Sequence, residues 1–256
     1  MRGLAALAAA FCVLAFQGAA TTTAASPFQD WAAVVVAGDW QASGGGPTKA
    51  FENARRDVRE ALIGAGFEQQ HIRTLSLEAG VPADDVTTGA NLAAALRQTA
   101  GQAQGGCLFY LTSHGSPQGA VLGRQGLLPP PMLDRLLQES CQDRPTVVFL
   151  SACYSGVYVP ALAAPNRMVM TAARADRTSF GCGADDKYPF FDGCVLQVWP
   201  TSRDFLALAQ GVRSCVARRE QEMMLSPASE PQLYTGARLR PLLPLLALPG
   251  ARRPAA

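Results

Sequence analysis

The sequence predicts an α/β fold in which helices cover both faces of a mostly parallel β-sheet. Apolar segments of strand length alternate with segments of helical spacing, a pattern typical of parallel sheets. The strand segments are apolar on both sides, which indicates that both faces of the sheet are buried. Of the 256 residues, 48% are hydrophobic and 16% are charged. This composition supports one full-sized core and excludes a disordered chain.

Six segments are expected to form the strands of this sheet. Residues 31–38 (WAAVVVAG) are a continuous apolar run that ends in glycine, and residues 107–112 (CLFYLT) and 146–150 (TVVFL) have the same character. The other three predicted strands are residues 72–77, 167–172 and 232–236. A small hairpin with turns at Gly123 and Gly126 is expected after the third strand.

Four helices are expected between the strands. The first covers residues 51–64, where Phe51, Val58 and Leu62 share one face. The other three are a helix capped by Thr87-Thr88, a helix over residues 132–139, and a long helix from Ser202 to about Glu222. The segment around Phe190 and Phe191 is expected to be an aromatic loop.

The N-terminus has the features of a secretory signal peptide. Met1-Arg2-Gly3 is a short cationic start, residues 4–16 form an apolar run, and small residues follow at possible cleavage sites. The alternative is a buried N-terminal helix. We expect residues 1–25 to be removed, residues 26–238 to form one domain, and the product to be periplasmic or extracellular. The Pro- and Leu-rich residues 239–256 are expected to be a disordered tail, because the prolines interrupt any helix.

The charge balance limits the choice of partners. The net charge is +2, from 22 Lys and Arg against 20 Asp and Glu, which argues against nucleic acid or an anionic membrane surface as the main partner. Asp185 and Asp186 could contribute to a calcium site, but two carboxylates without further oxygen ligands are typical of a solvated loop. We therefore expect no metal and no membrane span after signal cleavage.

Two strands end in residues that can carry chemistry. The third predicted strand runs into His114 and the fourth runs into Cys153. About forty residues separate them, which suits one strand-helix-strand crossover, so the two strands can be neighbours. Ligands of parallel sheets bind beyond the carboxyl ends of the strands. A thiolate there is a nucleophile, and a nearby imidazole can take its proton. His71, the only other histidine, falls at the opposite end of the sheet.

The segments around these residues resemble a known family. Ser113-His114-Gly115 and Ser151-Ala152-Cys153-Tyr154-Ser155-Gly156 resemble the His-Gly and Ala-Cys motifs of caspase-like cysteine peptidases, in particular the legumain-like C13 family and its bacterial members. Further matches are Thr171-Ala172-Ala173, Ser179-Phe180-Gly181-Cys182, Phe191-Asp192 and Ser229-Glu230-Pro231-Gln232. The resemblance extends over about residues 34–236. It implies a caspase-like three-layer αβα sandwich with a mostly parallel six-stranded sheet.

The resemblance also implies an activity. Cys153 would be the nucleophile and His114 its proton-handling partner, and the amides of Gly115 and Cys153 would bind the oxyanion. Such an enzyme hydrolyses peptide bonds of peptide or protein substrates through a thioester, without metal or organic cofactor. Ser151 stands where caspases carry glutamine and where legumain-like enzymes often carry an acid. We therefore expect Ser151 to affect substrate preference.

The same resemblance suggests where the substrate side chain binds. Lys49 from the loop after the first strand and Asp192 from the aromatic loop would pair across a pocket beside Cys153, with Ser179 on its wall. Such a pocket would favour Asn before the scissile bond, and Asp second. Lys49 replaces the family's arginine, so the discrimination would be weaker than that of a legumain. The alternative is an apolar pocket formed by Phe190 and Phe191.

Six cysteines remain after signal cleavage, and an exported product can form disulfides. Cys182 and Cys194 are twelve positions apart on one loop, and we expect them to pair. Cys107 and Cys141 are a second possible pair. The thiols could instead all be buried and reduced.

The sequence argues against three other functions. A serine hydrolase based on Ser155 would need glycine at position 153, where cysteine stands. Thiol-disulfide exchange would need two cysteines in Cys-x-x-Cys spacing, which the sequence lacks. The third is a caspase-like domain that no longer cuts and acts as a binding or scaffold module, against which the intact His114 and Cys153 argue.

Overall fold

The computed structural model describes residues 26–124 and 126–248. The expected signal peptide, residues 1–25, lies outside the described residues. All six predicted strands are present and form one sheet in the order β2-β1-β3-β7-β8-β9. The five neighbouring strands from β2 to β8 are parallel, and only β9 is antiparallel to its neighbour. The strands are β1 (Trp31–Ala37), β2 (Ile72–Leu75), β3 (Gly106–Thr112), β7 (Thr146–Ser151), β8 (Arg167–Thr171) and β9 (Gln232–Thr235).

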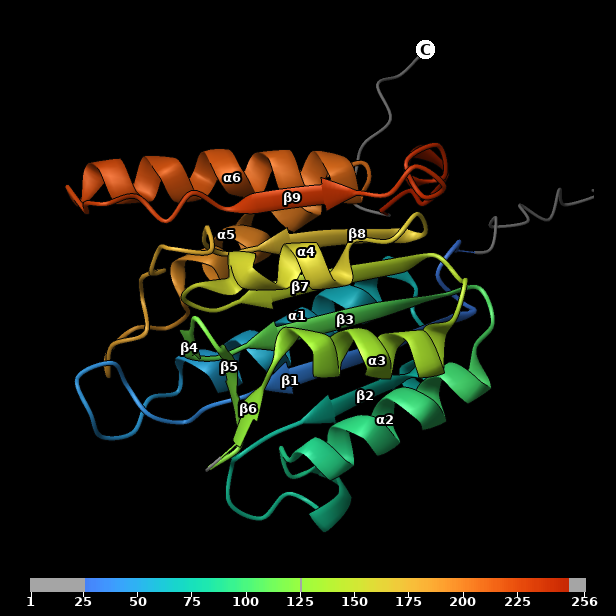
Figure 1. Ribbon diagram of the computed structural model, residues 1–256, viewed down its shortest axis with the longest axis horizontal. Helices are drawn as coiled ribbons and strands as arrows, with labels where there is room; N and C mark the ends of the chain where they lie inside the picture. Colours follow the sequence, from blue (N-terminus) through green and yellow to red (C-terminus); the bar gives the residue numbers. More distant parts are fainter. Residues whose placement is uncertain (1–25, 125, 249–256) are drawn as a thin grey trace, which may run out of the picture.

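Helices cover both faces of this sheet, as predicted. In Figure 1, α2, α3 and α4 lie in front of the sheet, and α1 and α5 lie behind it. The side chains divide in the same way, because each face of the sheet has its own apolar cluster. The helices are α1 (Ala50–Ala65), α2 (Gly89–Gln102), α3 (Pro130–Cys141), α4 (Tyr158–Leu162), α5 (Phe190–Val198) and α6 (Phe205–Glu222). None of the described helices is long and apolar enough to cross a membrane.

Local capping chemistry sets the helix starts. The Thr88 hydroxyl accepts a hydrogen bond from the Asn91 amide at 3.1 Å and begins α2. Asp204 caps α6 by accepting from the Ala207 amide at 2.7 Å. The helix begins at Phe205, three residues after the predicted start at Ser202, whose hydroxyl instead donates to the carbonyl of Val198.

The structure contains two helices and a small sheet that the sequence pattern did not fully predict. The segment expected to be an aromatic loop is the helix α5, which begins after Pro189. The short helix α4 follows the turn after Cys153. The predicted hairpin is present as β5 (Gly119–Leu122) and β6 (Gly126–Leu128), and it is extended by β4 (Gly115–Ser116).

The tail is not disordered over its first ten residues. Leu239 and Leu243 are fully buried, and Leu248 is also in the core behind the sheet. The amides of Arg238 and Leu239 donate to the carbonyl of Pro165 at 2.8 and 3.1 Å. The prolines prevent a long regular helix in this segment. Burial of the leucine side chains in the core nevertheless stabilises its docked conformation. Residues 249–256 lie outside the described residues.

The disulfides differ from the expected pairing. Cys107 pairs with Cys141 and Cys194 pairs with Cys215, while Cys153 and Cys182 are free. The prediction that Cys182 pairs with Cys194 is wrong, because Cys194 belongs to α5 and packs against α6. There its Cα atom lies 5.7 Å from that of Cys215, within the range that a disulfide spans.

Candidate active site

The strand register brings His114 and Cys153 to the same edge of the sheet. Thr112 at the end of β3 is the partner of Ser151 at the end of β7. One residue further, the Ser113 amide donates to the Ser151 carbonyl at 2.9 Å. His114 and Cys153 each lie two residues beyond the paired strand ends. The backbones of the two segments remain close at this point. A Cβ atom added to Gly115 would lie only 2.1 Å from the Cys153 carbonyl oxygen.

A tight turn presents the Cys153 thiol. Tyr154, the next residue, has a φ of 57°, a left-handed conformation that is uncommon for a side chain of this size. The Tyr154 amide donates to the carbonyl of Arg177 at 2.7 Å and so fixes the turn. The half-buried Cys153 Sγ accepts a hydrogen bond from the Ser179 amide at 3.2 Å, and it lies 3.6 Å from the Ser179 hydroxyl.

The contacts of His114 fix its tautomer. Its Nε2 atom lies 2.9 Å from the carbonyl oxygen of Gln41, and a carbonyl can only accept, so Nε2 carries the hydrogen. In the neutral ring, Nδ1 is then the atom free to accept a proton. The ring also packs edge-to-face on Phe51 of α1, with ring centres 5.0 Å apart. The loop after β1 thus orients the imidazole, a role that the sequence pattern did not assign to Gln41.

Backbone amides beside the thiol are available to a ligand. The Cys153 amide donates to no acceptor among residues 26–124 and 126–248. Gly115 follows the histidine and lies against the Cys153 carbonyl. Backbone amides can therefore donate hydrogen bonds to an oxygen that becomes negatively charged next to Sγ.

Two loops meet beside the site. The Ser43 amide donates to the Cys182 carbonyl at 2.9 Å, and the Thr48 hydroxyl donates to the Gly183 carbonyl at 3.0 Å. These bonds connect the loop after β1 to the loop that carries Ser179. Burial, and after it the negative charge of a Cys153 thiolate, raise the pKa of the Cys182 thiol to about 11. Cys182 is thus a neutral thiol close to the candidate nucleophile.

Asp192 does not face a substrate pocket. Its side chain is fully buried in α5. Its carboxylate accepts hydrogen bonds from Tyr110 at 2.5 Å, Thr112 at 2.9 Å and Ser151 at 2.6 Å. The expected contacts of Asp192 and Ser151 with substrate are therefore wrong, because the two side chains bond each other inside the protein.

Lys49 is also placed away from the thiol. Its Nζ atom lies 2.7 Å from Glu78 Oε1, and the side chain is mostly exposed. Lys49 lines a separate cavity of about 200 Å³, together with Asp39, Trp40, Glu52, Glu78, Arg124 and neighbouring residues. The expected pairing of Lys49 with Asp192 across a pocket is wrong, because each side chain has other partners.

The apolar alternative for this pocket fails as well. Phe191 is buried in the core behind the sheet. Phe190 is nearly buried and packs against Phe180 and the Arg219 guanidinium. Among the substrate-binding residues expected from the sequence, only Ser179 lies beside Cys153. Within the described ranges, no group of three or more His, Cys, Asp or Glu side chains could hold a metal ion.

Comparison with known proteins agrees with this geometry. The family model described as "Peptidase C13 family" matches residues 88–202, a range that contains both His114 and Cys153. Residues 88–202 are thus similar to the peptidase C13 family, and this match together with the fold supports a legumain-like C13 peptidase. No curated protein matches its sequence.

The fold of the chain is caspase-like. A structure described as "Crystal Structure of Caspase-1 from Spodoptera frugiperda" superimposes with a TM-score of 0.59 at 14% sequence identity, covering 82% of this chain and 88% of that chain. This likeness concerns the architecture: a mostly parallel six-stranded sheet between two layers of helices. Family and fold together support a cysteine peptidase.

Proposed function

We propose that this protein is an exported cysteine endopeptidase whose catalytic dyad is Cys153 and His114. The observation that carries the proposal is the shared position of the two residues, each two places beyond the paired ends of β3 and β7. Cys153 is the nucleophile, and His114 Nδ1 accepts its proton. The alternative is a silent scaffold, against which the intact pair of His114 and Cys153 argues.

The steps follow from the contacts. The Cys153 sulfur attacks the carbonyl carbon of the scissile bond, and the amides of Cys153 and Gly115 stabilise the oxyanion. His114 then donates its proton to the leaving amine, and a thioester remains. Water deprotonated by His114 attacks the thioester, the product acid leaves and the thiol is restored. The Gln41 carbonyl stabilises the imidazolium that forms in between.

The proposed preference is for Asn before the scissile bond, with Asp a weaker substrate. The groups of Ser179, Ser43 and Cys182 near the thiol can form hydrogen bonds but carry no charge at neutral pH. Asn can both donate to and accept from such groups. Asp would need a cation, and Lys49, the cation expected from the sequence, is paired with Glu78.

Export is proposed on two grounds. The first is the signal-like sequence of residues 1–25. The second is the pair of disulfides, Cys107–Cys141 and Cys194–Cys215, since disulfides persist in oxidising compartments. A processed N-terminus near residues 21–26 on protein recovered from the periplasm or medium would support this part. Full-length protein in the cytoplasm would contradict it.

The test is hydrolysis of a fluorogenic peptide series that varies only the residue before the scissile bond. Cys153→Ala should abolish hydrolysis, and His114→Ala should lower kcat/KM by roughly 10²–10⁴-fold. Cys182→Ala is the matched control, because it removes the other free half-buried thiol and should retain hydrolysis. Wild-type turnover in Cys153→Ala would refute the dyad. A clear preference for Leu, Phe or Arg would refute the Asn preference alone.

A further inference from the structure

One buried carboxylate connects the two strands that carry the proposed dyad. Asp192 Oδ2 accepts hydrogen bonds from Thr112 of β3 and Ser151 of β7, and Oδ1 accepts from Tyr110 of β3. Thr112 and Ser151 are direct partners in the sheet, the last pair of the ladder between these strands. We propose that Asp192 is a positioning residue that holds His114 and Cys153 in register by bonding the ends of both strands. This inference rests on the proposed function.

The stereochemistry explains why a carboxylate occupies this position. Side chains two residues apart on a strand lie on the same face of the sheet, and Tyr110, Thr112 and Ser151 all point toward α5. The three hydroxyl groups each need an acceptor in a place that water does not reach. An ionised carboxylate accepts all three bonds and has no hydrogen of its own to place. The strand ends are thereby fixed immediately before the residues that must meet.

Protonation of Asp192 would break this arrangement. A neutral carboxyl group carries a hydrogen that must itself find an acceptor, so at least one of the three hydroxyls has to turn away. Burial raises the pKa of Asp192 to about 6, and the three hydroxyl donors oppose this rise. The ionised, register-holding form therefore predominates above about pH 6 and is lost below it.

The other charged groups near α5 are committed elsewhere. Tyr110 is the titratable side chain that bonds Asp192, and its pKa is raised well above the ordinary value by burial and by this contact. On the packed helices, Glu52 binds Ser76 and Arg55, Asp57 binds Arg56 and Tyr188, and Arg219 lies over Phe190. The three hydroxyl donors are thus the groups whose removal should change the pKa of Asp192.

The test compares pH profiles of kcat/KM and of Cys153 alkylation by iodoacetamide. Thr112→Val and Ser151→Ala each remove one donor that lowers the pKa of Asp192, so the acid limb of both profiles should move to higher pH. Asp192→Asn should lower kcat, with little change in KM, by about 10- to 100-fold at neutral pH. Thr146→Val is the matched control, because Thr146 is a fully buried strand threonine of β7 whose hydroxyl donates to a backbone carbonyl. Its acid limb should stay in place.

The outcomes separate this role from simple structural support and from the proposed function. Equal loss of rate at every pH in Thr112→Val and Ser151→Ala, with no shift of the limb, would overturn the positioning role. So would a wild-type profile in Asp192→Asn. Alkylation needs no peptide, so a shifted alkylation limb without hydrolysis of any peptide would uphold the role of Asp192 and refute the peptidase. If Asp192→Asn does not fold, the two milder variants decide the question.

Discussion

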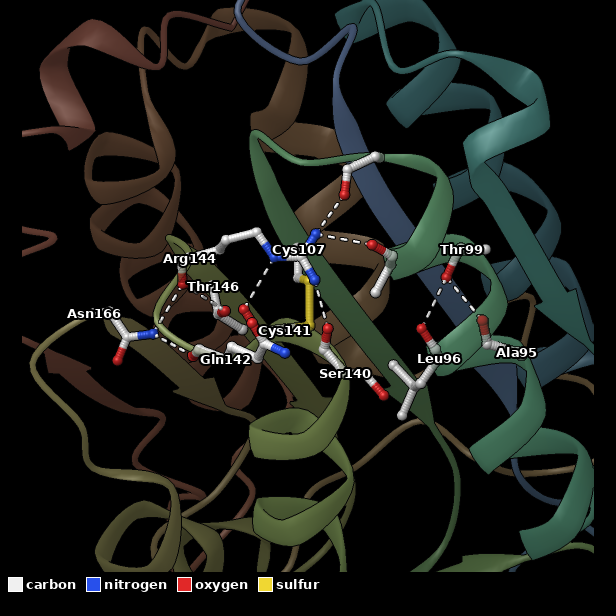
Figure 2. Close-up of a disulfide and its surroundings, with 12 residues drawn as sticks. Ala95, Leu96, Thr99, Cys107, Ser140, Cys141, Gln142, Arg144, Thr146 and Asn166 are labelled. Atoms are coloured by element: carbon white, nitrogen blue, oxygen red, sulfur yellow. Dashed lines mark hydrogen bonds between the residues drawn. A yellow bond between two sulfur atoms is a disulfide. The ribbon is translucent and has the colours of Figure 1, made fainter.

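At the amino end of the sheet, a disulfide joins Cys107 of β3 to Cys141 at the end of α3, whereas Cys153 and Cys182, in the loops at the carboxyl end, are free. Figure 2 shows Arg144 beside this disulfide, with its guanidinium directed at backbone carbonyls. Those carbonyls belong to Ala100, Ala103, Ser140 and Cys141, at or next to the ends of α2 and α3. One cation thus satisfies the carbonyls that two helix ends leave unpaired.

The carboxyl end is held in another way. Its loops are joined by single backbone contacts, such as those from Ser43 to Cys182 and from Tyr154 to Arg177. The thiol and the imidazole each keep an atom free for a substrate. We therefore expect the disulfide and the hydrogen bonds of Arg144 at the amino end to contribute more to stability than the loop contacts at the carboxyl end. Substitutions at the amino end should therefore lower mainly the free energy of unfolding, and substitutions at the carboxyl end mainly kcat/KM.

The largest effect is expected for Gly115→Ala at the carboxyl end. The new Cβ atom would lie 2.1 Å from the Cys153 carbonyl oxygen and 3.0 Å from the Ala152 Cβ, so the backbone must move. Displacing the amide that is proposed to bind the oxyanion should lower kcat/KM by about 10²-fold or more. The measurement is steady-state hydrolysis of the fluorogenic peptide. Gly44→Ala is the control, because a Cβ atom there meets nothing within 4 Å, and activity equal to this control would contradict the prediction.

The next largest effect is expected at the amino end. Replacing Cys107 and Cys141 by Ala should lower the free energy of unfolding by about 3–4 kcal/mol, because the disulfide closes a loop over 34 positions. The value of kcat/KM should not change while the protein is folded. Denaturant unfolding followed by fluorescence measures the first quantity.

The second disulfide sharpens this comparison. Cys194 lies on α5 two residues from Asp192, so replacing Cys194 and Cys215 by Ala should lower both stability and activity. If removal of Cys107–Cys141 reduces activity as much as removal of Cys194–Cys215, the two ends are not independent.

The fold was largely predictable because its strands carry a strong signal. Runs such as residues 31–37 and 146–151 are buried at every position, and such runs are visible in the sequence without knowledge of their neighbours. The sequence does not predict the helix α5, because the helix starts directly after Pro189 and its apolar residues come in a continuous run. The docking of Leu239 and Leu243 depends on a core cluster that residues distant in the sequence form together.

The candidate site was predictable only in part. Cys153 and His114 were found because strand ends and neighbouring glycines identify them in the sequence. The pocket residues were not, since the direction of a side chain in a loop depends on partners that the pattern does not show. Asp192 was expected to face the substrate, but hydroxyl groups of β3 and β7 hold it inside. The sequence does contain a sign of a buried acceptor. Tyr110 and Thr112 place hydroxyl groups at alternate positions of an otherwise apolar strand.

A smaller effect is expected for Arg144. Arg144→Met removes the hydrogen bonds to four backbone carbonyls and should lower the free energy of unfolding by about 2 kcal/mol. Arg144→Lys keeps the charge but cannot reach several carbonyls at once, so it should recover less than half of this loss. Chemical denaturation of the three proteins checks the order. Equal stability of Arg144→Met and the wild type would show that water replaces the guanidinium without cost.

The smallest effect is expected for Cys182, and it distinguishes the two free thiols. Burial raises the pKa of Cys182 to about 11, so this thiol stays protonated at neutral pH and should react with iodoacetamide only in strongly alkaline solution. Cys153, half-buried and contacted by the Ser179 amide, should be the thiol alkylated at neutral pH. Cys182→Ser should therefore leave both neutral-pH labelling and kcat/KM close to the wild-type values, while Cys153→Ala abolishes the labelling. Because a Cys153 thiolate raises the pKa of Cys182, alkylating Cys153 first should make Cys182 react at somewhat lower pH. Peptide mapping by mass spectrometry checks each step, and preferential labelling of Cys182 at neutral pH would reverse the assignment of the two thiols.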